Sequence, residues 1–301
     1  MNILIPGGTG LLGTALSAEL SAEGHQVWVL SRSPQRARAA GQVQFVQWDG
    51  KTATGWGHLV NQMDAIINLA GENIGAKRWS PQRKELIRVS RMEAGKAICD
   101  AVQNSTKRPG VLIQASGVGA YGPSGDQWLD ETAAYGQDFQ SRVCIDWEAS
   151  TRPVEALGVR RVVIRTGLVM TRQGGWMAPL TLAFRSFASG PLGSGKQWWS
   201  WIHLDDYIQG VIHLINHPAA VGIYNLVTPN PSQMNEFGRQ LARVLKRPYW
   251  IPAPAFGLRL LLGEMSDLIL LGQRASAQKM IAAGYAYRYA SLRPALDNLF
   301  G

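Results

Sequence analysis

A glycine-rich segment near the start of the chain limits the folds that this sequence can adopt. The apolar run NILIP is followed by Gly7, Gly10 and Gly13, and the last of these lies in LLGTALSAELSAEGH, which we expect to be helical. Glycines between a first strand and a helix let the chain turn and approach a phosphate closely, and the helix amino end favours negative charge. The spacing therefore predicts a Rossmann-type fold that binds a dinucleotide.

This loop supplies the candidate contacts to the pyrophosphate of the dinucleotide, with a glycine-rich turn that binds no ligand as the alternative. The candidates are Gly7, Thr9, Gly10, Leu11, Leu12 and Gly13. NAD-preferring sites generally carry Asp or Glu at the end of the second strand. Here Ser31 and Arg32 stand there. A hydroxyl and a guanidinium suit a 2′-phosphate, so we predict NADP over NAD, unless Arg32 is only a solvated loop residue.

The first 170 residues alternate β-rich runs with amphipathic helical stretches, which is typical of a doubly wound parallel sheet. Expected helices cover 80–103 and 138–157, and Pro153 is expected to kink or end the second. The expected strands are NILIPG, 26–31, 43–48, 64–71, 110–117, 160–167 and 222–227.

The composition changes after Arg165, where 171–204 becomes rich in Gly, Ser and Trp. We therefore expect an α/β fold with a Rossmann-type domain over 1–170, to which 205–227 returns. A smaller C-terminal substrate-binding lobe is expected from 171–204 and 228–301.

Charge and composition exclude several classes of function. The net charge of +9 comes largely from scattered arginines, among them Arg32, Arg36 and Arg38, so we expect no nucleic-acid partner. No apolar run approaches the roughly 18 residues of a membrane span, so we expect no membrane partner. Two cysteines and five histidines show no ligand spacing, which indicates no metal site and a reducing, cytoplasmic compartment. The N-terminus resembles a first strand rather than a signal peptide.

The motifs place the chain near a known group. NLAG (68–71), ASGVGAYG (115–122), VIRTGLV (163–169) and WIHLDDY (201–207) follow the glycine loop in the order seen in extended short-chain dehydrogenases/reductases. NLAGENIGAKRW, PLGSGKQWWSWIHLDD and GEMSDLILLGQRASAQKMIAAGY resemble the epimerase-like subfamily, which carries a characteristic C-terminal domain of unknown function.

The resemblance implies NADP(H) and a substrate cleft between the Rossmann-type domain and the C-terminal lobe. It places Ser31 and Arg32 at the adenosine 2′-phosphate. Further along the cofactor it implies contacts from Leu69, Ala70, Gly71, Arg91 and Val169. Ser116 stands where the family has its catalytic Ser or Thr, and we also count it among the cofactor contacts.

The proton-transferring pair of this group, Tyr-x-x-x-Lys, is missing. None of the eight tyrosines has a lysine four residues later, and the two positions of the pair fall at about Gln140 and Cys144. In this group the lysine lowers the pKa of the tyrosine phenol, which lets the tyrosine transfer a proton near neutral pH. Without the pair, the usual acid–base couple is absent. Tyr121, on the loop after the fifth strand, could donate a proton with help from Ser116, although packing of the loop is the alternative role.

Other candidates have structural alternatives of similar weight. Lys77 and Arg78 could attract an anion or remain solvated, and a nucleophilic Cys144 is less expected than a core cysteine. We expect His203, Asp205 and Asp206 to be structural, with Asp205 capping a helix. Four tryptophans could form an aromatic wall beside the cleft or lie in the core: Trp176, Trp198, Trp199 and Trp201.

Three functions therefore stay open. The first is an NADP(H)-dependent oxidoreductase or epimerase-like enzyme, monomeric or homo-oligomeric, acting on an unidentified small molecule. The second is a catalytically weak or inactive NADP(H)-binding redox sensor. The third is a nucleotide-sugar epimerase, which rests on fold analogy and suffers most from the absent tyrosine.

Overall fold

A computed structural model of the chain describes residues 1–34 and 41–301. In this part of the chain, seven parallel strands form one sheet in the order β11-β7-β5-β4-β1-β2-β3. The strands are β1 (Asn2–Pro6), β2 (Gln26–Ser31), β3 (Val43–Gln47), β4 (Ala65–Asn68), β5 (Val111–Gly117), β7 (Arg160–Thr166) and β11 (Gly222–Leu226). The predicted Rossmann-type α/β fold is confirmed.

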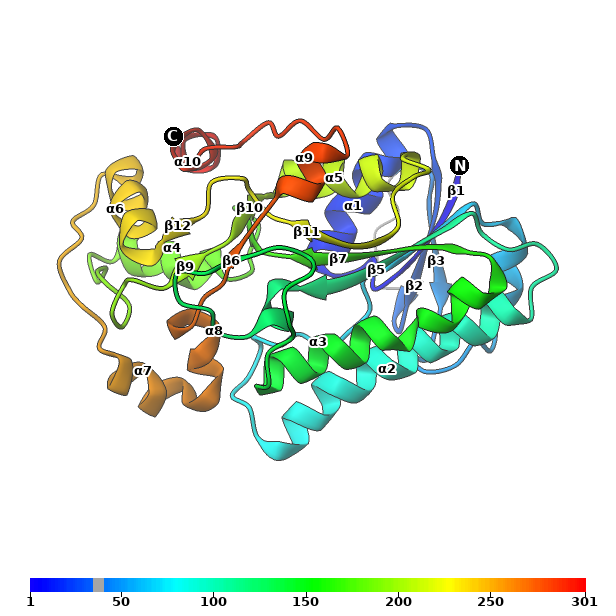
Figure 1. The fold of residues 1–301 in the computed structure, drawn as a ribbon, viewed down its shortest axis with the longest axis horizontal. Helices are drawn as coiled ribbons and strands as arrows, with labels where there is room; N and C mark the ends of the chain where they lie inside the picture. The colour runs from blue at the N-terminus through cyan, green and yellow to red at the C-terminus, as the bar shows by residue number, and fades with distance from the viewer. Residues whose placement is uncertain (35–40) are drawn as a thin grey trace.

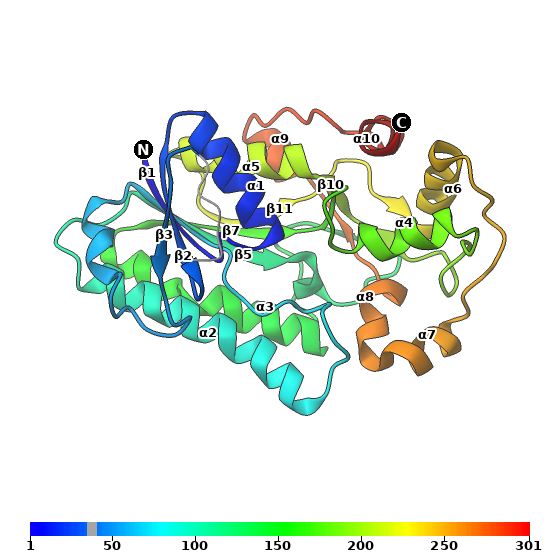
Figure 2. The same ribbon diagram turned by 180° about the vertical axis from the view of Figure 1, so that it is seen from behind.

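Helices cover both faces of this sheet, as Figures 1 and 2 show. The helices α2 (Pro81–Gln103) and α3 (Phe139–Ser150) pack together on one face. On the other face, α1 (Leu11–Ala22) and α5 (Leu204–Asn216) pack together. Because both faces are covered, the central strands are rich in apolar residues, and every residue of β4 is buried.

Local sequence signals explain where these helices begin and end. The Ser80 side chain accepts a hydrogen bond from the Arg83 amide at 3.1 Å, and Pro81 occupies the first turn of α2. The expected helix over 138–157 is divided: α3 ends at Ser150, and a 3-10 helix, η4 (Arg152–Leu157), follows with Pro153 in its first turn.

The remaining elements build a smaller lobe beside the carboxyl edge of the sheet. A second hydrophobic core there joins residues from 170–201 with residues from 234–299. Its helices are α4 (Met177–Arg185), α6 (Met234–Leu245), α7 (Ala255–Leu262), η5 (Gly263–Ser266), α8 (Asp267–Leu270) and α10 (Leu292–Phe300). The helix α9 (Gln278–Ala282) instead packs against β11, and its Met280 lies in the core of the main sheet. Its short strands pair as β8 (Leu168–Met170) with β10 (Trp201–His203), β9 (Trp198–Trp199) with β12 (Ser232–Gln233), and β6 (Trp128–Leu129) with β13 (Arg274–Ala275). That this lobe binds substrate stays a prediction.

The short 3-10 helices η2 (Gly57–Gln62) and η3 (Val118–Tyr121) complete the described elements. Over residues 1–34 and 41–301, no helix is long and apolar enough to cross a bilayer.

The WIHLDDY segment (201–207), which contains the start of α5, forms hydrogen bonds to the C-terminal part of the chain. The buried carboxylate of Asp206 accepts hydrogen bonds from the Tyr285 hydroxyl at 3.0 Å and from the amides of Arg288 and Tyr289 at 2.8 Å each. The expectation that Asp205 caps the helix is wrong, because the cap is His203, whose Nδ1 accepts from the Asp205 amide at 3.1 Å. The role of the segment is thus structural.

Replacing Asp206 with Ala should lower the free energy of unfolding by about 3 kcal/mol, because a buried carboxylate that accepts three hydrogen bonds is removed. Asp205→Ala is the matched control, since that half-exposed carboxylate lies 3.5 Å from Arg288 and 3.7 Å from His203 Nδ1 and should change stability by about 0.5 kcal/mol or less. Urea denaturation measures both. Equal effects of the two substitutions would contradict this account of the segment.

Candidate functional site

The glycine loop joins β1 to α1 by backbone contacts that no other residue permits. Gly7 has φ +84°, and a Cβ there would lie 2.6 Å from the Leu69 carbonyl carbon, so the loops after β1 and β4 touch. A Cβ on Gly13 would lie 2.5 Å from the Gly8 Cα. These contacts draw the start of α1 against the end of β1, at the point where the strand order reverses.

Gly10 has a different environment. Of the described atoms, only the Gly7 carbonyl oxygen lies within 4 Å of a Cβ built on Gly10, at 3.4 Å. Gly10 is also the N-cap of α1, and its carbonyl accepts the first helical hydrogen bond, from the Thr14 amide at 2.8 Å. The first turn of α1, which is fully described, carries no acidic side chain. The exposed Gly10 and the amide groups of Leu11 to Gly13 therefore fit an approaching pyrophosphate.

The end of β2 lies next to this loop in the sheet. Ser31 is buried, and its hydroxyl accepts a hydrogen bond from the Ser33 amide at 3.1 Å. Arg32 is exposed, so its guanidinium can reach an anion beside the strand end. Arg36 and Arg38, which follow, lie outside the described residues.

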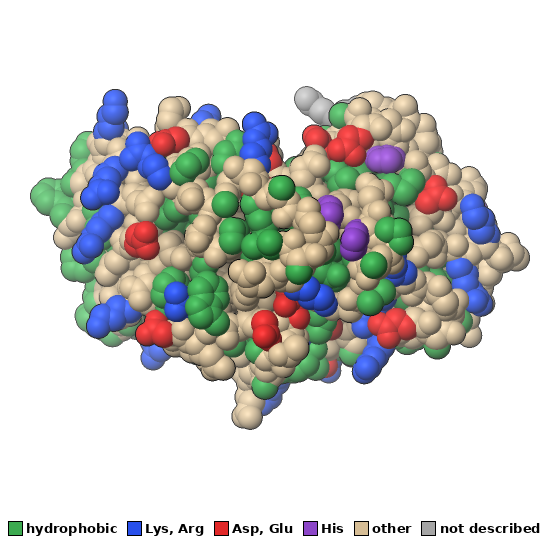
Figure 3. All heavy atoms as spheres, turned by 45° about the horizontal axis from the view of Figure 1, so that its top comes forward, with side chains coloured by type: hydrophobic (Ala, Val, Ile, Leu, Met, Phe, Trp, Pro, Cys, Tyr) green, Lys and Arg blue, Asp and Glu red, His purple; other side chains and the backbone are tan. Residues whose placement is uncertain are grey.

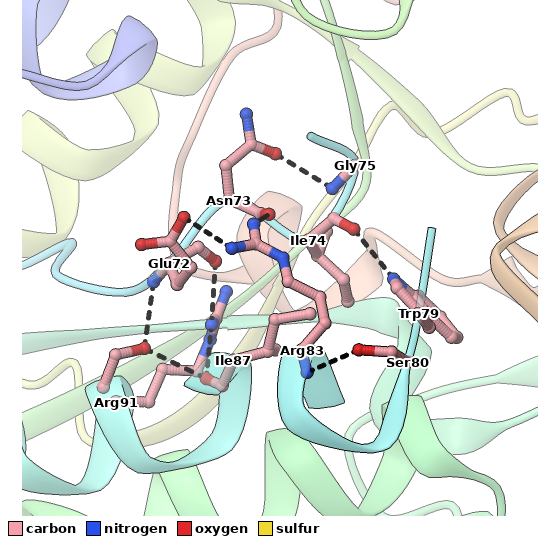
Figure 4. Close-up of polar contacts among 10 residues, drawn as sticks. Glu72, Asn73, Ile74, Gly75, Trp79, Ser80, Arg83, Ile87 and Arg91 are labelled. Carbon is pink, nitrogen blue, oxygen red and sulfur yellow. Dashed lines mark hydrogen bonds and ion pairs between the residues drawn. The ribbon is translucent and has the colours of Figure 1, made fainter. Parts of the chain in front are cut away.

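The loop after β4 is held against the first half of α2, as Figure 4 shows. Arg83 donates to the Glu72 carboxylate at 2.9 Å, and the Trp79 indole donates to the Ile74 carbonyl at 2.9 Å. Arg91 donates to the carbonyls of Glu72 at 3.0 Å and Ile87 at 2.8 Å (Figure 4). Leu69 and Ala70, at the start of this loop, are thereby fixed at the carboxyl edge of the sheet.

Arg91 is almost completely buried at this edge. A Cβ on Gly71 would lie 2.9 Å from the central carbon of the Arg91 guanidinium, so the glycine makes room for it. The Arg91 guanidinium also packs over the Trp147 ring, 4.6 Å from the ring centroid. Burial lowers the pKa of Arg91 to about 10, and its Nε has no hydrogen-bond partner in the described residues.

A cavity of about 240 Å³ opens beside Arg91, at the carboxyl ends of β5 and β7. It brings together Arg91, Ser116, Gln140 and Cys144 from the Rossmann-type domain. The smaller lobe contributes apolar and polar groups to the same cavity, namely Leu168, Trp198, Trp199, Ser200, Leu268, Leu271 and Gln273. The cavity is thus shared between the two parts of the chain.

The two positions predicted for the missing Tyr-x-x-x-Lys pair both line this cavity. Gln140 and Cys144 stand one turn apart on α3, beside Ser116. Burial, with a contribution from the Glu148 carboxylate, raises the pKa of the Cys144 thiol to about 11. Gln140 does not titrate and Cys144 stays a thiol near neutral pH, so neither residue replaces the usual couple.

Ser116 enters a buried polar network instead. Its hydroxyl donates to Glu148 Oε1 at 2.7 Å, and the Tyr135 hydroxyl donates to Glu148 Oε2 at 2.7 Å. Arg165 donates to both oxygens of the same carboxylate, at 2.9 and 3.0 Å. Burial alone would lower the pKa of Arg165, but the Glu148 carboxylate outweighs it and raises that pKa.

Tyr121 lies behind this network rather than in the cavity. It is absent from the described residues that line the cavity, and its hydroxyl donates to Asn225 Oδ1 at 2.7 Å. Its ring packs against the Arg165 guanidinium at 4.6 Å, and burial raises the pKa of its phenol. The structure therefore places Tyr121 as a packing residue of the loop and does not bring it beside the cavity with Ser116.

The remaining predicted residues are distributed between core, surface and cavity. Trp198 and Trp199 line the cavity, whereas Trp201 is completely buried in the core and Trp176 donates to the Val169 carbonyl at 2.8 Å. Val169 packs against the main core, and its neighbour Leu168 faces the cavity. Lys77 and Arg78 are exposed. The described residues contain no cluster of three or more potential metal ligands.

Comparison with known sequences decides the family. Residues 3–226 match the NAD dependent epimerase/dehydratase family. The chain belongs to this family. Residues 253–299 match a domain of unknown function, in agreement with the predicted C-terminal unit.

Relatives within the family cover the whole chain. An epimerase family protein of Staphylococcus aureus (strain N315) is 36% identical over 300 residues, covering 98% of each chain. The structure of human epimerase family protein SDR39U1 with NADPH is similar, with a TM-score of 0.88, 32% identity and 99% coverage of each chain. A nucleoside-diphosphate sugar epimerase from Corynebacterium glutamicum has a TM-score of 0.76 and 31% identity, covering all of this chain and 58% of its own.

The sequence did not reveal the buried polar group formed by Glu148, Arg165 and Tyr135. One signal was present: Glu148 lies four residues after Cys144, so both fall on the same face of α3. Arg165 and Ser116 are register partners in β7 and β5, which the strand assignments did not reveal.

The glycine contacts predict opposite results for two alanine substitutions. Gly13→Ala should lower the free energy of unfolding by about 2–3 kcal/mol, because its Cβ overlaps the Gly8 backbone. Gly10→Ala should change it by about 1 kcal/mol or less, since Gly10 has φ −74°, a Cβ there would make one ordinary contact, and alanine is a poorer N-cap than glycine. Thermal and urea unfolding measure both. A Gly10→Ala variant destabilised as strongly as Gly13→Ala would show that this position is packed.

Proposed function

We propose that this chain is an NADP(H)-dependent oxidoreductase or epimerase-like enzyme that acts on a small molecule through Ser116. One observation carries the proposal: the glycine loop and the cavity containing Ser116 open at the same edge of the sheet. The human relative whose structure contains NADPH supports the choice of cofactor. A doubly wound sheet binds its ligands at this edge.

The residues that would hold the dinucleotide follow the edge from β2 to β5. Gly7, Gly10 and the first turn of α1 would hold the pyrophosphate, and Arg32 would pair with the 2′-phosphate. Leu69, Ala70 and Gly71 would lie along the adenosine and ribose, and Arg91 would offer charge near the cavity. When bound, the nicotinamide would supply or accept a hydride.

The network below the cavity would handle the proton. Ser116 lines the cavity and its hydroxyl donates to Glu148, so a proton taken from a substrate hydroxyl would replace the one that Ser116 passes to Glu148 Oε1. The other carboxylate oxygen contacts the hydroxyl of Tyr135, a residue 44% exposed. Arg165 donates to both oxygens of the same carboxylate and holds it in place. For the proton to leave, the Tyr135 hydroxyl would release its own proton to solvent and take one from Glu148, so the proposed path to solvent is Ser116–Glu148–Tyr135.

A redox sensor that binds NADP(H) without turnover is the second candidate. The presence of Gln140 and Cys144 at the positions of the usual pair favours it. A nucleotide-sugar epimerase has support from the Corynebacterium glutamicum relative, but the same two residues argue against it. Turnover measurements separate these candidates.

Cofactor choice should depend on Arg32. In Arg32→Asp, the affinity for NADPH should fall by about 10- to 100-fold, because a charged hydrogen bond to phosphate is lost, while the affinity for NADH stays within about threefold. Calorimetric titration of the apo-protein measures both. Arg152→Asp, an exposed position on η4, is the matched control with the same change in charge. Parallel losses for both dinucleotides would contradict the assignment of Arg32 to the 2′-phosphate.

Turnover should depend on Ser116. With a panel of aldehydes and ketones, the rate of NADPH oxidation at 340 nm should fall by about 100-fold or more in Ser116→Ala, because the group that transfers the proton is removed. Tyr135→Phe should lower the rate less and alter its pH profile, whereas Tyr121→Phe should alter neither.

The controls decide between the candidates. NADPH affinity should stay unchanged in Tyr135→Phe. If NADPH binds but no panel member is reduced by the wild-type protein, the redox-sensor function is favoured over the enzyme.

A further inference from the structure

The smaller lobe exposes a group of large apolar side chains at the end of the molecule away from β3. They lie on α4, on the connections that follow α4 and α6, and on α7. We call this group the apolar strip, and it consists of Leu182, Phe187, Trp250, Ile251, Phe256, Leu260 and Leu261. Each is between 49% and 79% exposed, and contiguous surface of this kind generally marks an interaction site.

Hydrogen bonds connect three members of the strip, namely Phe187, Trp250 and Ile251. The Trp250 indole donates to the Phe187 carbonyl at 2.9 Å, and the amides of Trp250 and Ile251 both donate to the Ser189 carbonyl. The chain then continues along the left edge of Figure 1 into α7. Phe256 and Leu260 are four residues apart there and share a helix face. Within the described residues, α7 buries none of its side chains.

The same segments carry most of the net positive charge of the chain. Residues 177–196 and 234–262 contain seven Lys or Arg residues and one acidic residue, Glu236. These 49 residues therefore hold six of the nine net positive charges. The exposed cations include Arg185, Arg243, Lys246 and Arg259. Figure 3 shows Lys and Arg side chains gathered at this end of the molecule, beside protruding hydrophobic side chains.

Phe187 combines a strained backbone conformation with an exposed ring. Phe187 follows the C-cap of α4 with φ +59°, a conformation that favours glycine and is costly for a bulky residue. Its ring is 52% exposed and contacts the Arg247 guanidinium at 4.9 Å. An aromatic ring displayed at a glycine-type position, next to a cation, points to a function outside the fold's own stability.

We propose that the apolar strip docks this protein on the surface of an anionic lipid bilayer. Exposed aromatic and leucine side chains insert at the headgroup boundary, and the surrounding cations pair with anionic headgroups. The aliphatic members on α7 favour lipid over a nucleic acid, and the excess of cations disfavours a second copy of the same charged surface. This proposal departs from the sequence-based expectation of no membrane partner, because docking needs no spanning helix. It does not depend on the proposed function.

Flotation of the full-length protein with phosphatidylcholine vesicles, with and without about 30% phosphatidylglycerol, tests the proposal. Binding should require phosphatidylglycerol and should fall at least tenfold between 50 and 500 mM salt (roughly, from the Debye length). The double variant Phe256→Glu/Leu260→Glu should lose more than tenfold in binding. Arg243→Glu/Lys246→Glu should lose a similar amount, since each cation near such a surface contributes about fivefold.

Two further variants separate docking from misfolding. Phe187→Gly should bind vesicles more weakly while its melting temperature is not lowered, because glycine relieves the backbone strain. Val221→Glu, at an exposed valine outside the strip, should bind as the wild type does. Absence of binding to phosphatidylglycerol vesicles overturns the proposal, and so does equal binding by the strip variants. If light scattering shows a dimer that the strip variants lose, and no vesicles are bound, the proposal is overturned and the strip is an interface with a second copy of this chain.

Discussion

The close approach of α1 to β1 is the constraint on which the rest of the site depends. Gly13 rests on the Gly8 backbone, and Gly7 turns the chain where the loop after β4 meets it. A side chain at either position would push the helix away from the sheet. With the helix in place, its amino end points into the same edge where β5 and β7 end, so the proposed anion site and the Ser116 cavity share one face.

Much of this arrangement could be predicted from sequence, because it depends on local signals. The glycine spacing, the alternation of apolar strands with amphipathic helices, and the Ser-Pro start of α2 are each encoded within a few residues. The family's motif spacing also located Gln140 and Cys144, and both line the cavity. Boundaries were less accurate: β4 ends at Asn68 rather than at Gly71, because the loop turns there toward α2.

The rest depends on contacts between distant segments, which spacing alone does not encode. Tyr121 follows β5 as the sequence suggested, but Asn225 and Arg165, more than 40 residues away, hold it out of the cavity. Glu148 meets Ser116 only because α3 packs over β5. Similarly, the charges of α6 and the apolar face of α7 become one surface only when the lobe folds.

We propose a dinucleotide site at the glycine loop and proton chemistry at Ser116 and Glu148. The central claim is that the first turn of α1 holds the dinucleotide with its reacting end at Ser116. A crystal structure determined with NADPH tests this claim most directly. The account predicts the pyrophosphate on the amides of Leu11 and Leu12, with the nicotinamide ring in the cavity between Ser116 and Leu168. A dinucleotide bound elsewhere, with α1 free of phosphate, would contradict it.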